Sequence, residues 1–436
     1  MIRKLLLSAV LIMFCVANFA QDKPANAAVS LKVVADKADA VYKTGDKVKF
    51  LVSVMEKGNP LEGKKIEYTI HRDGSAEAQK GSIISKSSPV EIETSLDTPG
   101  FILCTVSFAG PPKADAAAGA GVSPLEIKAS GAVPADLKEF WQKKLEELKK
   151  IPMNAKMDKV ELEGNLKEKM ECFDIRADCY GGVPVSGYYV RPLNAKEKSC
   201  PAIVTYQGAG VRSSNKNIWH AQNGMISLDI NAHGIENGKP KEFYDELIKG
   251  KLANYARSGS DDREKTYFLG MFLRVIRALE FIKSQPEWDG KTLIVQGGSQ
   301  GGAQSLVAAA LDPQITLCTV FVPAMCNQQE VLFNCRPTWP NCIIAKDGKA
   351  VKPDVVKAMS YYDPSFLAPE IKAETFVSVG FIDTTCTPTA VYSMYNNLRC
   401  KKSIMNGILV THTVAQEASK EANARIAEHI REMKTK

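Results

Sequence analysis

Residues 294–311, IVQGGSQGGAQSLVAAAL, decide the fold: a β-branched apolar run, a serine between glycines and an alanine-rich segment follow one another without a gap. We predict a strand, a sharp turn and a helix. The turn has the pattern Gly-x-Ser-x-Gly centred on Ser299. Its glycines have a steric reason, because a turn that lifts a serine hydroxyl off a strand leaves little room for side chains. This setting favours a nucleophilic serine over the alternative, a glycine turn with only a structural role.

Apolar strands and helical segments alternate around this stretch. The other buried strands that we expect are AIVTY (202–206), MISLDI (225–230), LCTVFVP (317–323), TFVSVG (375–380) and SIMNGILV (403–410). Residues 261–284 and 415–433 place apolar side chains at helical spacing, which predicts helices. Strands separated by helical segments indicate a parallel sheet with helices on both faces. A hairpin that turns at Gly181 and Gly182 adds an antiparallel edge.

The N-terminal third has a different pattern. Six short alternating runs separated by Gly, Pro, Asp and Asn indicate an antiparallel β-sandwich of immunoglobulin-like type. We expect the Ala/Gly tract 114–121 to be a long loop and LEIKAS (125–130) to be a closing strand. The predicted organisation is a β-sandwich domain at 21–130 and an α/β domain at 131–436.

The first residues have the pattern of a secretory signal. Two basic residues precede an apolar run and small residues follow it, which predicts a signal peptide at 1–20 and an exported mature protein, periplasmic or extracellular. Lipid anchoring at Cys15 is disfavoured, because bulky Phe14 stands where a small residue is expected. No later segment is apolar for long enough to span a bilayer.

Charge and cysteine content narrow the class of protein further. The formal net charge of +7 falls to +5 without Arg3 and Lys4, which is modest and argues against a nucleic-acid partner. Ten of the eleven cysteines remain after the signal, in a compartment that permits disulfides. We expect most to be free and buried. The pairs to test for bridges are Cys335 with Cys342 and Cys172 with Cys179.

A nucleophilic serine needs a base, and the base needs an orienting acid. Of the five histidines, His412 follows an apolar strand directly and precedes the last helix, so it is the predicted base. His233, which follows another strand, is the alternative. Asp383 follows strand 375–380 and is the predicted acid. The order Ser299, Asp383, His412 is that of the α/β-hydrolases.

The other candidates fit less well. Asp229 would place the acid ahead of Ser299 in the chain, and Asp312 lies at the end of the helix that follows the serine. His220 lies in a polar segment. His429 lies within the last helix, where we expect it to face solvent.

Four segments carry a family resemblance. They are YQGAG (206–210), RVIRALEFIKSQPEWDGKTLIVQGGSQGG (274–302), YYDPSFLAPEIKAETFVSVGFIDTTCTP (361–388) and YNNL (395–398) with Lys401. The chain resembles the acetyl xylan esterases and cephalosporin-C deacetylases of carbohydrate esterase family seven. The resemblance implies an α/β-hydrolase fold with Ser299 as nucleophile, Asp383 as acid and His412 as base. It also implies an oxyanion hole formed by the backbone N–H groups of Gln300 and Ala209.

The resemblance runs from about residue 135 to the C-terminus, with departures from the family pattern. The chain has DINAHG (229–234) where the family has Asp-x-Arg-Gly after the second strand. Thr413 stands where the family has Glu after its histidine, and Thr387 replaces a proline. These departures leave the predicted chemistry intact and bear on the choice of substrate.

The resemblance implies a secreted serine esterase that removes acetyl groups from acetylated xylo-oligosaccharides or related sugars through an acetyl-enzyme. His233 and Trp339 are the residues we expect to bind substrate, with residues 325–359 covering the pocket. The alternatives are a peptidase of the same fold and a catalytically silent carbohydrate-binding or cell-surface protein. Because the β-rich third lies outside the family core, we expect removal of the residues before about 133 to spare chemistry on small acetates.

No cofactor is expected. The chain has neither His-Glu-x-x-His nor another tight cluster of histidines and carboxylates, so no metal requirement is predicted. The expected partner is an acetylated oligosaccharide substrate. Assembly into a homo-oligomer stays open at the level of sequence.

Overall fold

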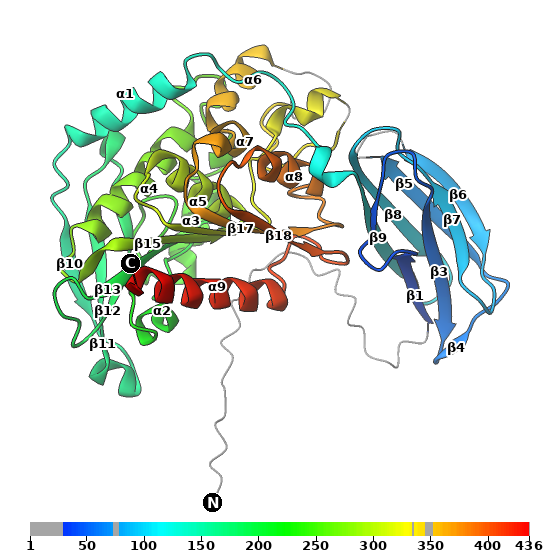
Figure 1. Ribbon diagram of the computed structural model, residues 1–436, viewed down its shortest axis with the longest axis horizontal. Coiled ribbons are helices and arrows are strands. Elements are labelled where there is room, and N and C mark those ends of the chain that lie inside the picture. The colour runs from blue at the N-terminus through cyan, green and yellow to red at the C-terminus, as the bar shows by residue number, and fades with distance from the viewer. Residues whose placement is uncertain (1–28, 73–77, 334, 345–351, 436) are drawn as a thin grey trace, which may run out of the picture.

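A computed structural model describes residues 29–72, 78–333, 335–344 and 352–435. A smaller β-sandwich lies beside a larger α/β unit and contacts it near helix α8 (Pro388–Asn397) (Figure 1). The predicted signal peptide at 1–20, with Cys15, lies outside the described residues. The β-rich N-terminal region and the α/β part that the sequence predicted are both present.

The β-sandwich consists of two facing sheets. Its strands are β1 (Val29–Ala35), β2 (Val41–Tyr42), β3 (Val48–Glu56), β4 (Asn59–Pro60), β5 (Lys65–Arg72), β6 (Ala78–Ile84), β7 (Val90–Thr94), β8 (Gly100–Phe108) and β9 (Ala114–Val122). One sheet contains β1, β3, β4 and β7, and the other has the order β2-β9-β8-β5-β6. Alternate residues of β3 and β8, such as Phe50 and Ile102, are buried between the sheets, as expected for strands with one face on a core.

The prediction for the Ala/Gly tract was wrong. Residues 114–121 form most of strand β9, which pairs with β8 over its whole length. Alanine and glycine have low strand propensity, which hid the alternation of buried Ala114, Ala116 and Ala118. The expected closing strand at 125–130 is also absent, and its start is the 3-10 turn η1 (Pro124–Glu126).

The larger unit is built on a nine-stranded sheet. Its strands are β10 (Lys156–Val160), β11 (Met170–Ala177), β12 (Val185–Pro192), β13 (Cys200–Tyr206), β14 (Ile226–Ile230), β15 (Trp288–Gly298), β16 (Leu317–Phe321), β17 (Glu374–Gly380) and β18 (Lys402–Gly407). They lie in the order β10-β11-β12-β14-β13-β15-β16-β17-β18. The strands from β14 to β18 run parallel, while β10, β11 and β12 form the predicted antiparallel edge. The carboxyl ends of the parallel strands therefore share one edge, where loops can bring their residues together.

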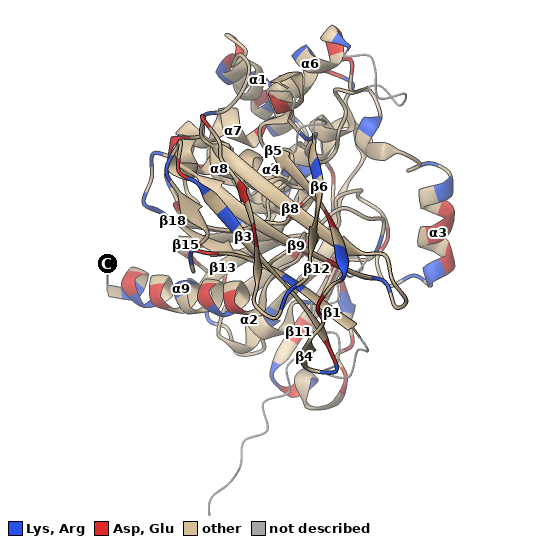
Figure 2. Ribbon diagram, turned by 90° about the vertical axis from the view of Figure 1, so that its right-hand side faces the viewer, with Lys and Arg blue, Asp and Glu red and all other residues tan. Residues whose placement is uncertain are grey.

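Helices cover both faces of this sheet (Figure 1). They are α1 (Leu137–Lys149), α2 (Ile218–Gln222), α3 (Lys241–Lys249), α4 (Tyr267–Lys283), α5 (Gln300–Leu311), α6 (Pro353–Met359), α7 (Pro364–Leu367), α8 and α9 (Gln416–Thr435). Helices α4 and α5 pack on one face, and α9 packs across the other. In Figure 2, basic and acidic residues are interspersed along both α3 and α9. Helix α4 begins later than the predicted residue 261, because the chain before Tyr267 is a series of turns.

His429 does not face solvent, contrary to the expectation. It is 9% exposed, and its Nε2 lies 2.8 Å from Oγ1 of Thr316. His429 follows Ile426 by one helical turn, so both side chains lie on the face of α9 that packs on the sheet. The amphipathic pattern predicted the helix correctly, but it led us to expect His429 on the solvent face instead of the buried face.

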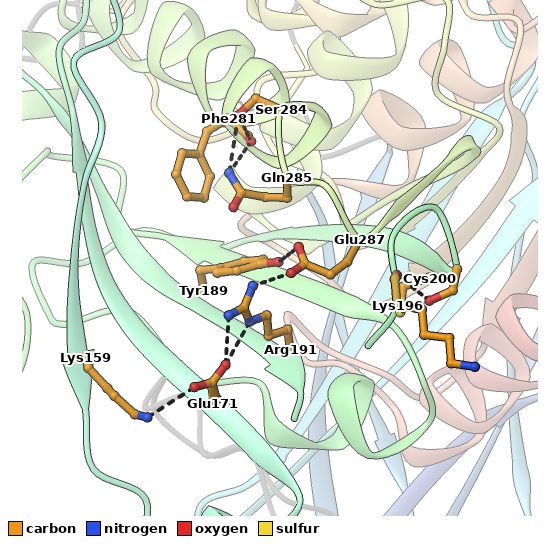
Figure 3. Close-up of polar contacts among 11 residues, drawn as sticks. Lys159, Glu171, Tyr189, Arg191, Lys196, Cys200, Phe281, Ser284, Gln285 and Glu287 are labelled. Carbon is orange, nitrogen blue, oxygen red and sulfur yellow. Dashed lines mark hydrogen bonds and ion pairs between the residues drawn. The ribbon is translucent and has the colours of Figure 1, made fainter. Parts of the chain in front are cut away.

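An ion-pair network ties the antiparallel edge to the strand that precedes the serine turn. Arg191 on β12 donates to Glu171 on β11 and to Glu287, which lies just before β15 (Figure 3). Glu287 also accepts from the phenol of Tyr189, at 3.4 Å. Because Glu287 is buried, Arg191 is partly buried and the two are paired, the network fixes the relative position of these strands.

The cysteines within the described residues form no disulfide. Cys172 and Cys179 are both buried thiols, so the bridge suggested for them is absent. The thiol of Cys342 donates to the carbonyl of Ala256 at 3.1 Å and is not joined to Cys335. The expectation that most cysteines are free and buried is confirmed.

Candidate active site

Ser299 occupies the strained turn between β15 and α5. Its backbone has φ 55° and ψ −122°, a left-handed conformation that is costly for a residue with a side chain. The turn is held from both sides: the Ser299 N–H donates to Phe321, and its carbonyl accepts from Ala303 and Ala324, at 2.9 to 3.1 Å. The strain is therefore imposed by surrounding structure and serves to present the hydroxyl at the sheet edge.

The glycines around Ser299 are required by close contacts. A Cβ on Gly297 would lie 2.3 Å from the carbonyl oxygen of Gly301, and a Cβ on Gly301 would lie 2.0 Å from that of Tyr206. A Cβ on Gly302 would meet the main chain of Pro323 at 2.9 Å. The structure thus shows the steric reason predicted for these glycines, since a side chain at any of the three positions would clash with backbone atoms.

The structure brings Ser299, His412 and Asp383 together. The Ser299 Oγ lies 2.8 Å from Nε2 of His412, and the His412 Nδ1 lies 2.8 Å from Oδ2 of Asp383. A carboxylate only accepts, so Nδ1 carries the proton donated to Asp383, and Nε2 is left to accept from the serine hydroxyl. His412 thus lies between an acid and an alcohol in the tautomer that can take the serine proton.

Asp383 is held rigidly behind His412. Its carboxylate is buried, with the residue 3% exposed, and its Oδ1 accepts the backbone N–H groups of Thr385 at 2.8 Å and Cys386 at 2.9 Å. These bonds compensate the burial of the charge and aim the other oxygen at the imidazole.

The rival residues lie elsewhere. Asp229 accepts from Thr205, Gln207 and Asn215 and so ties together the loop after β13. Asp312 ends α5 and forms an ion pair with Lys283 at 2.6 Å.

The two other candidate histidines are buried. Burial lowers the pKa of His220, on α2, to about 4. His233 is 4% exposed: its Nε2 contacts the carbonyl of Gly210 at 3.0 Å and its Nδ1 contacts the phenol of Tyr267 at 2.8 Å. Burial lowers the pKa of His233 to about 4, so the ring is neutral at pH 7, and Nε2 carries the proton given to Gly210. It also lines a cavity of about 520 Å³.

Two backbone N–H groups are positioned by the turns beside Ser299. Gln300 is the first residue of α5, so its N–H has no partner within the helix. The peptide between Gly208 and Ala209 is oriented by Arg212, whose Nη2 donates to the Gly208 carbonyl at 3.1 Å. Because C=O and N–H point in opposite directions in a trans peptide, the Ala209 N–H is directed away from Arg212.

Tyr255 joins these two backbone segments. Its phenol donates to Oε1 of Gln300 at 2.9 Å and accepts the N–H of Gly210 at 3.4 Å. Sequence reasoning did not identify Tyr255 or Arg212, because Tyr255 begins a short 3-10 turn, Tyr255–Arg257, and Arg212 lies in a loop, and neither segment carries a motif. Arg212 could have been noticed, because it is only four residues after Gly208 in the chain.

Trp339 lies beside the acid loop. Its backbone N–H donates to the carbonyl of Thr385 at 2.9 Å, and its ring lies 6.1 Å from that of Phe268 in an edge-on arrangement. The side chain is partly exposed. The first contact ties Trp339 to the segment that carries Asp383, and the second ties it to α4.

The described ranges contain neither a metal cluster nor a membrane-spanning helix. No group of three or more His, Cys, Asp or Glu side chains there could hold a metal ion. Across the same ranges, no helix is both long and apolar enough to cross a membrane.

A family model described as acetyl xylan esterase (AXE1) matches residues 125–430. The acetyl esterase Axe7A of Xylanibacter ruminicola is 28% identical over 424 residues, which cover 96% of this chain and 94% of that protein. The similarity to Axe7A therefore extends through the β-sandwich as well as the α/β unit.

Solved structures share the fold of the larger unit. An acetyl xylan esterase from Paenibacillus sp. R4 has a TM-score of 0.60 and 25% identity, covering 70% of this chain and 98% of that chain. Acetyl xylan esterase 1 from Thermoanaerobacterium sp. JW/SL YS485 has a TM-score of 0.60 and 21% identity, covering 70% and 97%. The predicted α/β-hydrolase fold is confirmed.

Proposed function

We propose, from the premise that this chain belongs to the acetyl xylan esterase family, that it removes O-acetyl groups from acetylated xylo-oligosaccharides or related acetylated sugars through an acetyl-enzyme on Ser299. Family membership makes the protein a carboxylic ester hydrolase and supports acetyl xylan esterase activity. The serine mechanism and the roles of the site residues go beyond family membership and are part of the proposal. The observation that carries them is the hydrogen-bonded series from Asp383 through His412 to Ser299.

The first half of the reaction transfers the acetyl group to the enzyme. Nε2 of His412 takes the Ser299 proton as Oγ attacks the acetyl carbonyl, which forms a C–O bond and a tetrahedral oxyanion. The oxyanion collapses, the bond to the sugar oxygen breaks, and the imidazolium gives its proton to that oxygen. Asp383 stabilises the imidazolium and keeps the ring in its productive tautomer.

The oxyanion is stabilised by backbone donors. Gln300 supplies an N–H at a helix start, where the helix dipole also favours negative charge, and Ala209 supplies the second N–H. Arg212 and Tyr255 hold the loop that carries Ala209, so these donors need little reorganisation during the reaction. Losing one such donor costs about 10² to 10³ in kcat in other enzymes.

The second half of the reaction releases acetate. Water enters beside His412, Nε2 removes a proton from it, and the hydroxide adds to the acetyl carbon. The tetrahedral species expels the Ser299 oxygen, which recovers its proton from the imidazolium. The products are acetic acid, which ionises to acetate and a proton in water, and the original enzyme, so atoms and charge balance without a cofactor.

The decisive experiment locates the acetyl group. The purified full chain is mixed with an acetylated xylo-oligosaccharide or an aryl acetate, acid-quenched during turnover, digested and examined by mass spectrometry. We expect acetate release, an initial burst of phenol from the aryl ester, and an acetyl group on the peptide containing Ser299. Ser299→Ala is the control and should lack both the burst and the adduct. Unchanged turnover by that variant would disprove the mechanism.

The two alternatives predict different results. A peptidase of this fold would cleave aminoacyl amides faster than acetyl esters. A silent carbohydrate-binding protein would bind xylo-oligosaccharides and release no acetate from any ester. A panel of acetylated sugars, an aryl acetate and an aminoacyl anilide separates all three.

Export to the periplasm or the medium is also part of the proposal. It is supported by the basic and apolar pattern of residues 1–20. N-terminal sequencing of the protein from its native host tests it: a mature chain that begins near residue 21 is expected, and one that retains Arg3 and Lys4 would contradict it.

A further inference from the structure

Phe101 belongs to the β-sandwich by sequence but packs into the α/β unit. Along β8, Ile102 and Cys104 point into the sandwich core, while Phe101 is on the opposite face and is only 4% exposed. It is part of the hydrophobic core of the larger unit. Its ring meets that of Phe381 edge-on at 4.8 Å and lies 5.4 Å from that of Tyr392 on α8.

Strand β9 approaches the same point through glycine. The outward face of β9 changes along the strand, from exposed Asp115 to buried Gly119 and Gly121. A Cβ on Gly119 would lie 2.3 Å from the carbonyl oxygen of Phe381. A Cβ on Gly121 would lie 2.9 Å from the ring of Phe101. The small residues of β9 thus permit main-chain contact between the sandwich and the α/β unit.

Phe381 is two residues before Asp383 in the loop after β17. Its N–H donates to Gly407 at 2.9 Å, and the next N–H, of Ile382, donates to Val410 at 3.3 Å. Val410 lies two residues before His412. Phe381 is therefore enclosed by the sandwich on one side and by the loop that carries His412 on the other.

A second set of contacts holds the sandwich in this place. The side-chain amide of Asn396 on α8 donates to the carbonyls of Pro124 and Ile127, at 2.9 and 2.8 Å. The phenol of Tyr392 donates to Asn406 on β18 at 2.7 Å. Helix α8 contacts η1 and β8, and in Figure 1 the sandwich lies beside α8.

We propose that the β-sandwich is a positioning element for catalysis: Phe101 and Gly119 hold Phe381, and through it the Asp383–His412 pair, in its reactive geometry. The proposal rests on the function proposed above. It reverses the expectation that removing the residues before about 133 spares chemistry on small acetates. Neither residue touches substrate, so both act only through Phe381.

The test compares matched substitutions in the full chain with a small aryl acetate. Phe101→Ala removes the contact with Phe381, whereas Phe108→Ala removes a phenylalanine of the same strand that packs inside the sandwich. We expect kcat to fall on the order of 10-fold or more for Phe101→Ala with KM little changed, because misplacing a catalytic group by about 1 Å can cost 10²-fold. Phe108→Ala should retain kcat.

A second pair of variants covers the case in which Phe101→Ala fails to fold. Gly119→Ala adds one carbon against the main chain of Phe381, and Gly81→Ala adds one carbon against the Tyr68 ring, within the sandwich. The first should lower kcat and the second should not. Circular dichroism and thermal unfolding of all four variants establish folding before the kinetics are compared.

A double-mutant cycle separates positioning from general destabilisation. If Phe101 acts through Asp383, its substitution should lower kcat in the normal enzyme and have almost no further effect in an Asp383→Asn background. The same loss of kcat in both backgrounds would overturn the proposal, as would equal kcat for Phe101→Ala and Phe108→Ala or for Gly119→Ala and Gly81→Ala. An enzyme that Ser299→Ala fails to inactivate would instead disprove the proposed function.

Discussion

The phenol of Tyr255 donates a 2.9 Å hydrogen bond to Oε1 of Gln300. Because the same phenol accepts the Gly210 N–H, one side chain connects the loop after β13 with the start of α5. These are the two segments from which the proposed oxyanion donors come. Their relative position therefore depends on a residue 45 positions away from each in the chain.

Tyr255→Phe should lower kcat for an aryl acetate on the order of 10-fold, with a smaller change in KM, because the donors are needed chiefly in the transition state. Tyr244→Phe is the matched control, since it removes a phenol that accepts from Lys239 and donates to Glu236 instead. Steady-state kinetics decide the matter. Equal kcat for the two variants would show that Tyr255 has no role in positioning the donors.

His412→Ala should reduce kcat about as much as Ser299→Ala, and the double variant should be hardly worse than either, because residues that act as a unit are not additive. Asp383→Asn should keep some activity; in another triad enzyme the corresponding loss is about 10⁴. His233→Ala should still turn over. An active His412→Ala enzyme beside an inactive His233→Ala enzyme would mean that the base is His233.

Arg212→Lys should lower kcat on the order of 10-fold although the charge is kept. The guanidinium donates through Nη1 to Ala209 and through Nη2 to Gly208, and an ammonium cannot reproduce this planar fork. Kinetics on an aryl acetate test this, with circular dichroism as the check of folding. Full activity of the lysine variant would show that charge alone orients the loop.

We expect the titration of Asp229 to lower the free energy of unfolding as pH rises. Burial raises the pKa of Asp229 to about 6, above the value of about 4 in an unfolded chain, so the folded protein binds the extra proton between these pH values. The stabilising effect of protonation is present below about pH 4 and lost by about pH 6, and over that window it amounts to about 2 to 3 kcal/mol.

The check is urea unfolding of the normal protein and Asp229→Asn between pH 4 and pH 7. As pH rises, the free energy of unfolding of the unsubstituted protein should fall relative to that of Asp229→Asn. Contributions from other carboxyl groups, such as Asp363, whose pKa burial also raises to about 6, cancel in this difference. A difference that stays constant with pH would contradict the prediction.

The strand-turn-helix around Ser299 could be predicted because its signals are local. Apolar periodicity, glycines at fixed spacing and an alanine-rich run act within a few residues of one another. The same holds for Asp383 and His412, since each directly follows a predicted strand and parallel strands end at one edge of a sheet. Residue type and position along the chain were therefore sufficient to predict that these side chains lie close together.

The errors had equally physical causes. The Ala/Gly tract 114–121 forms a strand because it pairs with β8, packs its alanines in the sandwich core and lets Gly119 approach Phe381, conditions that its own strand propensity does not reveal. His429 is buried because α9 packs lengthwise across the sheet. In both cases a tertiary contact overrode a local preference.

The sequence by itself determined the alternating strands and helices of the α/β unit, their order, and the placing of Ser299, Asp383 and His412 at one edge of the sheet, because each of these depends on short-range pattern and on chain topology. Only the tertiary structure decided which side chains support that site. Tyr255 against Gln300, Arg212 against the Gly208 carbonyl, and Phe101 against Phe381 are contacts set by how packed elements meet in space. Such contacts leave no periodic trace in the chain, since a single side chain in an irregular segment or at the end of a strand satisfies each of them.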